Sequence, residues 1–143
     1  MSAAEHPIWD ILRGAAPLAP CSELLGMSVI EIAADGGRMK FQYQPTAAMT
    51  NPLGFVQGGF VTAMLDDVMA PALISTCPPE TSIPTLEIKT SFIKGVVPGP
   101  VICEGWVVKK TRTVAFMAAE LTSLEGDLLA TATATFRIIA PKE

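Results

Sequence analysis

Two adjacent carboxylates, Asp66 and Asp67, stand within residues 60–70, a segment that is otherwise almost entirely apolar. An ionised carboxylate removed from water must be paired, hydrogen-bonded or shifted in pKa, so a carboxylate in this segment is a candidate general base or nucleophile. The plainer interpretation is that both side chains lie on one solvated edge. On a helix the two residues point about 100° apart, so they cannot share one environment.

The pair Gly58 and Gly59, directly before this segment, is the second chemical feature. Glycine lets a backbone approach a ligand closely. The first turn of a helix offers unpaired N–H groups and about half a positive charge, which suits a developing oxyanion. A glycine pair is equally typical of a tight loop that leads into a helix.

The spacing of these features limits how they could act together. Asp66 follows Gly58 by eight residues, about 12 Å along a helix that rises 1.5 Å per residue. That distance is too long for both groups to act on one carbonyl. If both are catalytic, the carboxylate must come from a second copy of the chain, which predicts a homo-oligomer with shared active sites.

A long buried helix is expected to carry both features. Residues 60–70 are too long a run, and too rich in Ala, Met and Leu, for a strand. Their apolar residues leave no clean polar stripe, which is typical of a helix buried on most sides. Pro71 is expected to kink or end this helix near residues 68–70, because proline removes an N–H that a helix interior uses.

Strands are expected on both sides of this helix in the sequence. Residues 27–44 predict two strands joined by a turn at 35–37, where glycines tolerate positive φ. In residues 130–135 alanines alternate with threonines, so one strand face carries small residues that let a helix lie close. Alternating polar and apolar residues predict an antiparallel meander of four strands at 85–92, 101–108, 113–122 and 128–138.

The length and composition favour one α+β domain over residues 1–143, with residues 1–25 as a helical segment packed on it. The chain is 50% hydrophobic and 17% charged, which is enough apolar material for a packed core. Three cysteines without CxxC spacing fit neither a disulfide scaffold nor a zinc site; we expect them to be small core residues in a reducing compartment.

The same totals exclude several function classes. His6 is the one histidine, so a histidine-rich metal site or a Ser-His-Asp triad is not expected. A net charge of −4 argues against nucleic-acid binding, which needs a basic footprint. Without a signal-peptide pattern or a long uncharged apolar stretch, the protein is expected to be cytoplasmic and not to enter a membrane.

The loop and helix start resemble a known family signature. Asn51, then residues 54–59 (Gly-Phe-Val-Gln-Gly-Gly), then six residues and Asp66, is similar to the motif of hotdog-fold acyl-CoA thioesterases of the phenylacetate-degradation (PaaI-like) type. The strand order extends the likeness over roughly residues 27–139. It implies a hotdog fold, a curved antiparallel sheet of five to six strands wrapped around a long central helix. It also implies dimers with sheets joined edge to edge, often paired into tetramers.

Residue by residue, the resemblance implies hydrolysis of acyl-CoA thioesters to a free acid and coenzyme A, with no metal or organic cofactor. Gly58 would supply the N–H that polarises the thioester carbonyl, and Asp66 of the partner subunit would be the nucleophile or the general base. Asn51 would orient the thioester or the water. Thr85 falls where the family often has a Ser or Thr that positions the attacking water, although an ordinary strand threonine is an equal alternative.

Gln57 departs from the family pattern, which usually has histidine at that position. An amide does not titrate near neutral pH, so Gln57 cannot shuttle protons, but it can still donate a hydrogen bond. Gln57 is therefore a binding or a structural residue, and Gln57 and its neighbour Gly59 are the substrate-binding candidates in this motif. The departure also keeps open a non-catalytic acyl-CoA binder or degenerate homologue. A hotdog hydratase or dehydratase is disfavoured, because that chemistry generally uses a histidine.

A basic cluster at a predicted hairpin end is the last binding candidate. The cluster consists of Lys109, Lys110 and Arg112. These side chains either belong to a solvated turn or contact the phosphates of coenzyme A. The acyl or aryl group would lie against apolar helix residues, although core packing is the favoured interpretation of each of them: Phe60, Met64, Leu65 and Met69. Neither the acyl group nor the choice between dimer and tetramer follows from the sequence.

Overall fold

The computed structural model describes residues 5–142; residues 1–4 of the predicted N-terminal segment and residue 143 lie outside the described residues. The described strands form one antiparallel sheet in the order β1-β2-β4-β5-β6-β3. They are β1 (Ser28–Ile32), β2 (Arg38–Tyr43), β3 (Thr85–Phe92), β4 (Val101–Lys110), β5 (Val114–Ser123) and β6 (Leu128–Arg137). The helices are α1 (Ile8–Leu12), α2 (Pro20–Leu24), the single 3-10 turn η1 (Ala47–Met49) and α3 (Gly58–Ile74).

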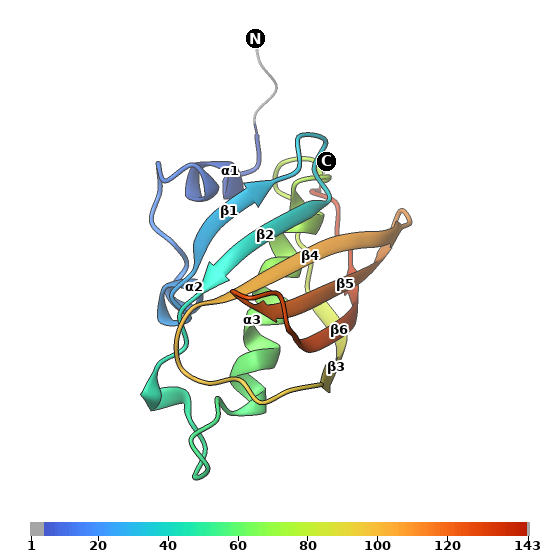
Figure 1. Ribbon diagram of the computed structural model, residues 1–143. Coiled ribbons are helices and arrows are strands. Elements are labelled where there is room, and N and C mark those ends of the chain that lie inside the picture. The colour runs from blue at the N-terminus through green and yellow to red at the C-terminus, as the bar shows by residue number, and fades with distance from the viewer. Residues whose placement is uncertain (1–4, 143) are drawn as a thin grey trace.

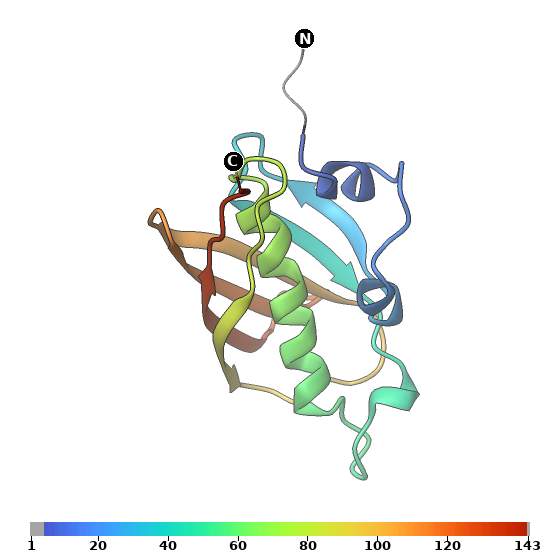
Figure 2. The same cartoon turned by 180° about the vertical axis from the view of Figure 1, so that it is seen from behind.

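The sheet curves around α3, with β3 along one side of the helix and β1 and β2 along the other (Figures 1 and 2). The apolar residues that leave α3 without a polar stripe are buried against the sheet. Burial of this kind is the main favourable contribution to folding. The predicted α+β architecture of a curved sheet wrapped around a long central helix is confirmed.

A row of small residues lets α3 approach the sheet closely. Gly105, Ala119 and Ala132 are neighbours across β4, β5 and β6, and all three are buried. A Cβ atom at Gly105 would lie only 3.1 Å from the carbonyl oxygen of Val68, so α3 packs directly on the backbone of β4. The alanines predicted to form the helix-facing side of β6 are buried, as expected.

Pro71 is expected to kink or end the helix near residues 68–70, and the expectation that the helix ends there is wrong. α3 continues through Pro71 to Ile74. Proline removes one helix hydrogen bond, but Pro71, Ala72 and Leu73 are all buried in the core, and this packing offsets the lost bond. Beyond the proline the ladder resumes, with the Ser75 N–H donating to the Pro71 carbonyl at 3.0 Å.

The predicted meander is correct for three of its four strands. β4, β5 and β6 are successive neighbours, but β3 pairs with β6 instead of β4, and β2 takes the place beside β4. The connection from β3 to β4 spans residues 93–100 and contains Pro98 and Pro100, so it is longer than a hairpin turn and cannot form a ladder. It carries the chain past the N-terminus of α3 to β4, an interior strand of the sheet (Figure 1), and β3 remains at an edge.

The described part of the predicted N-terminal helical segment contains two short helices, α1 and α2, and Ile8 and Trp9 pack against the core. All three cysteines are free, but Cys21 is exposed, so the expectation of a core residue is wrong at that position. Cys21 lies in α2, whose outer side meets solvent. None of the helices in residues 5–142 is both long enough and apolar enough to cross a membrane.

Candidate functional site

One stripe of α3 faces the edge strand β3, and it carries both chemical features of the sequence. Residues four apart lie on the same side of a helix, and Gly58, Thr62 and Asp66 are spaced in this way. The Thr62 and Thr90 hydroxyl oxygens lie 2.9 Å apart in the middle of the stripe. The two ends of β3 therefore lie beside the two candidate catalytic positions.

Asp66 lies at one end of this stripe, half-buried, where the Thr85 hydroxyl donates to its Oδ1 at 3.1 Å. Burial raises the pKa of Asp66 above its ordinary value, the bond from Thr85 opposes this shift, and the nearby charge of Asp67 adds to it. A desolvated carboxylate with a hydroxyl beside it is suited to accept a proton or to attack a carbonyl.

Asp67 has a different environment, as predicted from the turn angle of a helix. Its carboxylate accepts hydrogen bonds from the Ser22 hydroxyl and the Tyr43 hydroxyl, each at 2.8 Å. Burial raises the pKa of Tyr43 well above its ordinary value, which keeps its proton on the phenol as a donor. Asp67 thus ties α2 and β2 to the central helix and is occupied by structural bonds.

Gly58 is the first residue of α3, at the opposite end of the stripe. The first backbone N–H of this helix to donate to a preceding carbonyl is that of Phe60, which bonds to the Gln57 carbonyl at 2.9 Å. The N–H groups of Gly58 and Gly59 precede it, in the turn where a helix has no carbonyl to offer them. The ring of Phe92, the last residue of β3, lies 3.0 Å from where a Cβ of Gly58 would be.

A cavity of about 350 Å³ lies beside this helix start. Its walls are mainly apolar and come from the loop before α3, from α3 itself and from the segment after β3: Phe55, Val56, Gly58, Val61, Phe92, Ile93, Lys94, Gly95 and Val96. The expected acyl-binding residues of the helix are instead in the core, since Met64, Leu65 and Met69 are fully buried and Phe60 packs against them. The side chain of α3 that reaches this cavity is Val61.

Asn51 organises the loop before α3. Its Oδ1 accepts the N–H groups of Leu53 and Phe55, at 3.0 and 3.2 Å, and its own N–H donates to the Phe55 carbonyl at 2.7 Å. The carboxamide oxygen therefore fixes the place of Phe55. Gln57 follows with an exposed side chain and a backbone that turns into the helix.

The basic cluster lies at the other end of the molecule from Gly58 in the same chain. Figure 1 shows the β4–β5 turn away from the start of α3. Lys110 Nζ donates to the Thr76 carbonyl and hydroxyl oxygens, at 2.7 and 3.1 Å, just beyond the C-terminal end of α3. Lys109 and Arg112 are exposed. A cation at this end of a helix is also favoured by the helix dipole.

The structure thus brings Asp66 and Thr85 together, and it brings the Asn51 loop together with Gly58, but it keeps these two groups at separate ends of the stripe. Sequence reasoning missed Phe55 and Phe92. The available signal was weak, because a large apolar residue at a loop or strand end is common on protein surfaces.

In residues 5–142, no three His, Cys, Asp or Glu side chains are grouped as a metal ion would require.

Comparison with known proteins assigns the family. The thioesterase superfamily model matches residues 53–130. A phenylacetic acid degradation-related protein from Ralstonia eutropha JMP134 is 35% identical, with 90% of this chain and 97% of that chain covered and a TM-score of 0.85. Comparison with curated proteins gives no match.

Two further solved structures share the fold at lower identity. The PaaI protein of the E. coli phenylacetic acid degradation operon is 18% identical, with 82% of this chain and 86% of that chain covered and a TM-score of 0.74. A Streptococcus mutans UA159 protein bound to acetyl CoA is 19% identical, with 82% and 91% covered and a TM-score of 0.73. The matched family model spans α3 together with β3, β4 and β5. The chain belongs to the thioesterase superfamily, the hotdog-fold class of thioester hydrolases.

Proposed function

We propose that this protein hydrolyses acyl-CoA thioesters to a free acid and coenzyme A, in sites shared between two subunits. The observation that carries the proposal is the stripe of α3, which presents unpaired N–H groups at Gly58 and a half-buried carboxylate at Asp66 about 12 Å further along. The Gly58 end supplies the hydrogen-bond donor for the carbonyl oxygen, and the Asp66 end supplies the carboxylate. A second copy of the chain can place its Asp66 beside the Gly58 of the first, and its Gly58 beside the Asp66 of the first.

The edge strand β3 supports a specific way of joining two copies. β3 pairs with β6 on one side and has no neighbouring strand on the other within residues 5–142. An unpaired edge eight residues long is a ready template for another strand. A fully overlapped antiparallel pairing of β3 with itself puts Thr85 of one subunit opposite the partner's Phe92. Asp66 then approaches the partner's Gly58, and the two-fold axis produces two such sites.

In the proposed reaction, the thioester carbonyl oxygen accepts a hydrogen bond from the Gly58 N–H, and the partner's Asp66 acts on the carbonyl carbon. By one route, an Asp66 oxygen bonds to that carbon, the C–S bond breaks to release coenzyme A as the thiolate, and water hydrolyses the resulting anhydride. By the other, Asp66 takes a proton from water while the water oxygen bonds to the carbon; the C–S bond then breaks, and the departing coenzyme A thiolate takes up the proton from Asp66.

Supporting roles follow from the positions of the remaining candidates. Thr85 holds Asp66 and positions the water, and Asn51 orients the loop that meets the thioester. Gln57 and Gly59 contact the substrate beside the helix start. The phosphates of coenzyme A lie near the basic cluster of Lys109, Lys110 and Arg112. The S. mutans protein of this fold binds coenzyme A in the form of acetyl CoA. Two or four subunits provide the shared sites.

The first test is the Asp66→Asn variant, assayed with a series of acyl-CoAs and a reagent that traps the released thiol. Removing the nucleophile or base is expected to lower kcat by about 10³-fold or more and to leave substrate binding within a few-fold. Asp67→Asn is the matched control and is expected to lower stability but keep activity in the folded protein. A wild-type protein that binds acyl-CoA without turnover is a binder, and the proposal then fails.

The oxyanion role has its own test in Gly58→Pro. Proline removes the N–H and is tolerated at the first position of a helix, and the extended Gln57 (φ −58°, ψ 137°) suits a following proline. We expect kcat to fall about 10²-fold. Gly58→Ala adds a methyl near Phe92 but keeps the donor, so the difference between the two variants isolates the N–H. Equal activity of both would exclude this donor.

A further inference from the structure

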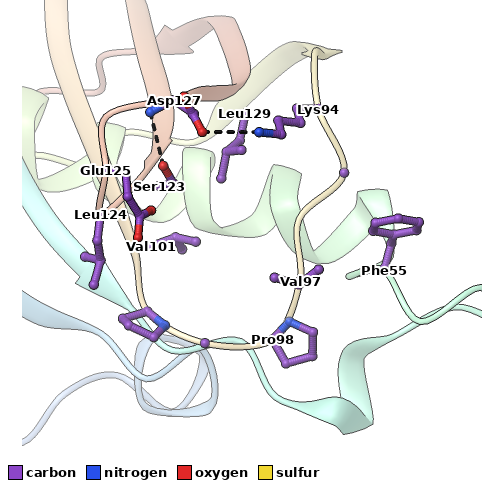
Figure 3. A pocket seen from close by; sticks show the side chains of 13 residues that line it. Phe55, Lys94, Val97, Pro98, Val101, Ser123, Leu124, Glu125, Asp127 and Leu129 are labelled. Carbon is purple, nitrogen blue, oxygen red and sulfur yellow. Dashed lines mark hydrogen bonds and ion pairs between the residues drawn. The ribbon is translucent and has the colours of Figure 1, made fainter.

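A second cavity, of about 600 Å³, lies between the β3–β4 connection and the β5–β6 hairpin. Figure 3 shows the connection from Lys94 to Val101 curving around it, with Leu124 and Leu129 on the hairpin side and Phe55 at the opposite edge of the view. The apolar walls come from both segments: Phe55, Val97, Pro98, Pro100, Val101, Leu124 and Leu129. No step of the proposed hydrolysis uses this space.

The two cavities meet at three residues. Phe55, Lys94 and Gly95 line both the cavity beside Gly58 and the larger one. A Cβ atom at Gly95 would lie 2.6 Å from the ring of Phe55, so this ring packs directly on the backbone of the connection. The ring thus stands at the boundary between the cavities, held through the bonds of its backbone to Asn51.

The charges around the larger cavity favour an uncharged occupant. Lys94 Nζ is paired with Asp127 at 3.2 Å, and Glu125 lies on the same rim. The local balance is therefore acidic, which disfavours the phosphates of coenzyme A. The apolar walls suit a hydrocarbon chain, whose burial is favourable in proportion to the area removed from water.

We infer that the larger cavity binds the distal part of a long acyl chain and that Phe55 is the residue that limits entry to it. This inference rests on the proposed function, because the chain is placed by the thioester at Gly58. A short acyl group fits in the first cavity alone. A longer chain has to pass the ring of Phe55 and then lies along Val97 and Leu129. Phe55 is thus a specificity-determining residue for chain length.

The test compares kcat/KM for acetyl-, butanoyl-, octanoyl-, dodecanoyl- and hexadecanoyl-CoA in the wild type and in Phe55→Ala. Removing the Phe55 ring is expected to raise the ratio of kcat/KM for dodecanoyl-CoA to kcat/KM for butanoyl-CoA by about tenfold or more. Leu53→Ala is the matched control, because Leu53 is in the same loop, 83% exposed and outside both cavities. An unchanged ratio in an active Phe55→Ala protein would overturn the inference.

A second variant acts in the opposite direction. Val97→Trp adds bulk to the larger cavity at a side chain that is 61% exposed, so the fold should tolerate it. We expect kcat/KM to fall about tenfold for dodecanoyl-CoA and to stay within twofold for butanoyl-CoA. A uniform change for all chain lengths would count against a role of this cavity in binding the chain.

Binding measurements separate this inference from the proposed function. Dodecyl- and butyl-CoA thioethers lack the carbonyl, so they bind without being hydrolysed, and calorimetry gives their dissociation constants. If the wild type turns over no acyl-CoA, hydrolysis is wrong, but Val97→Trp should still weaken the dodecyl thioether alone. If hydrolysis is observed and both thioethers bind equally to wild type and Val97→Trp, the chain-binding cavity is wrong and hydrolysis stands.

Discussion

Asp66 and Asp67 are chemically identical neighbours whose surroundings give them different roles. Two donated bonds, from Ser22 and Tyr43, occupy Asp67, whereas Asp66 has the single bond from Thr85 and a raised pKa. A carboxylate that accepts a hydrogen bond on each oxygen serves as a structural anchor. A desolvated carboxylate that accepts only one hydrogen bond binds a proton more readily. The Thr85 hydroxyl therefore lowers the pKa of Asp66 and partly offsets the larger effect of burial.

Replacing Thr85 with valine removes the hydrogen bond that lowers the pKa of Asp66, so this pKa should rise further. The proposed reaction needs the ionised carboxylate, so kcat/KM is expected to fall as the pH drops through the pKa of Asp66. The acid limb of the profile should therefore move to higher pH in Thr85→Val, and kcat on the plateau should fall about tenfold. The pH dependence of kcat/KM measures both effects.

Thr90→Val is the control for that experiment. It removes a hydroxyl from the same strand, but the partner of Thr90 is Thr62 and not the carboxylate. Its acid limb should coincide with that of the wild type, while Thr85→Ser should restore the original limb. A shift of equal size in Thr90→Val would point to a general change in the packing of β3.

At the scale of elements, the close contact between α3 and β4 gives a stability prediction. A methyl group at Gly105 would meet the backbone of Val68 and Met69, at 3.1 and 3.2 Å, which cannot move without shifting the helix. Gly105→Ala is therefore expected to lower the free energy of unfolding by about 1–3 kcal/mol. Urea denaturation measures it, with the exposed Thr133→Ala on β6 expected to stay within about 0.5 kcal/mol. A neutral Gly105→Ala would contradict the tight packing.

The elements themselves could largely be predicted from the sequence, because local patterns specify them. The β1–β2 hairpin, the helix that carries Asp66 and the period of the later strands all follow from residues close in sequence. The partner of β3 and the continuation of α3 through Pro71 could not, because both depend on packing between distant segments.

The candidate site divides in the same way. Gly58, Asp66 and Thr85 are positioned by one helix and the strand beside it, so a motif and a helix rise are enough to locate them. The positions of Phe55 and Phe92 at the helix start depend on how two loops and a strand end meet. No local pattern encodes such a meeting of segments.

At the scale of the whole molecule, the proposed sharing of each site between two subunits predicts complementation. A heterodimer of Asp66→Asn and Gly58→Pro subunits combines one intact Gly58 with one intact Asp66 across the interface. Two different affinity tags allow its isolation, and it should show about half the activity of a wild-type dimer, although each variant alone should keep about 1% of that activity or less. An inactive heterodimer would mean that the two groups act within one chain or not at all.

The strand β3 touches the Gly58 end of α3 with its last residue and the Asp66 end with its first. The length of β3 therefore sets the distance between the two halves of the proposed site. Deleting one residue from this strand would turn the following side chains to the opposite face, and in the proposed symmetric assembly it would disrupt every copy of the site. Engineering for new substrates is better directed to exposed side chains of the β3–β4 connection such as Val97, which can be replaced without changing the length of β3.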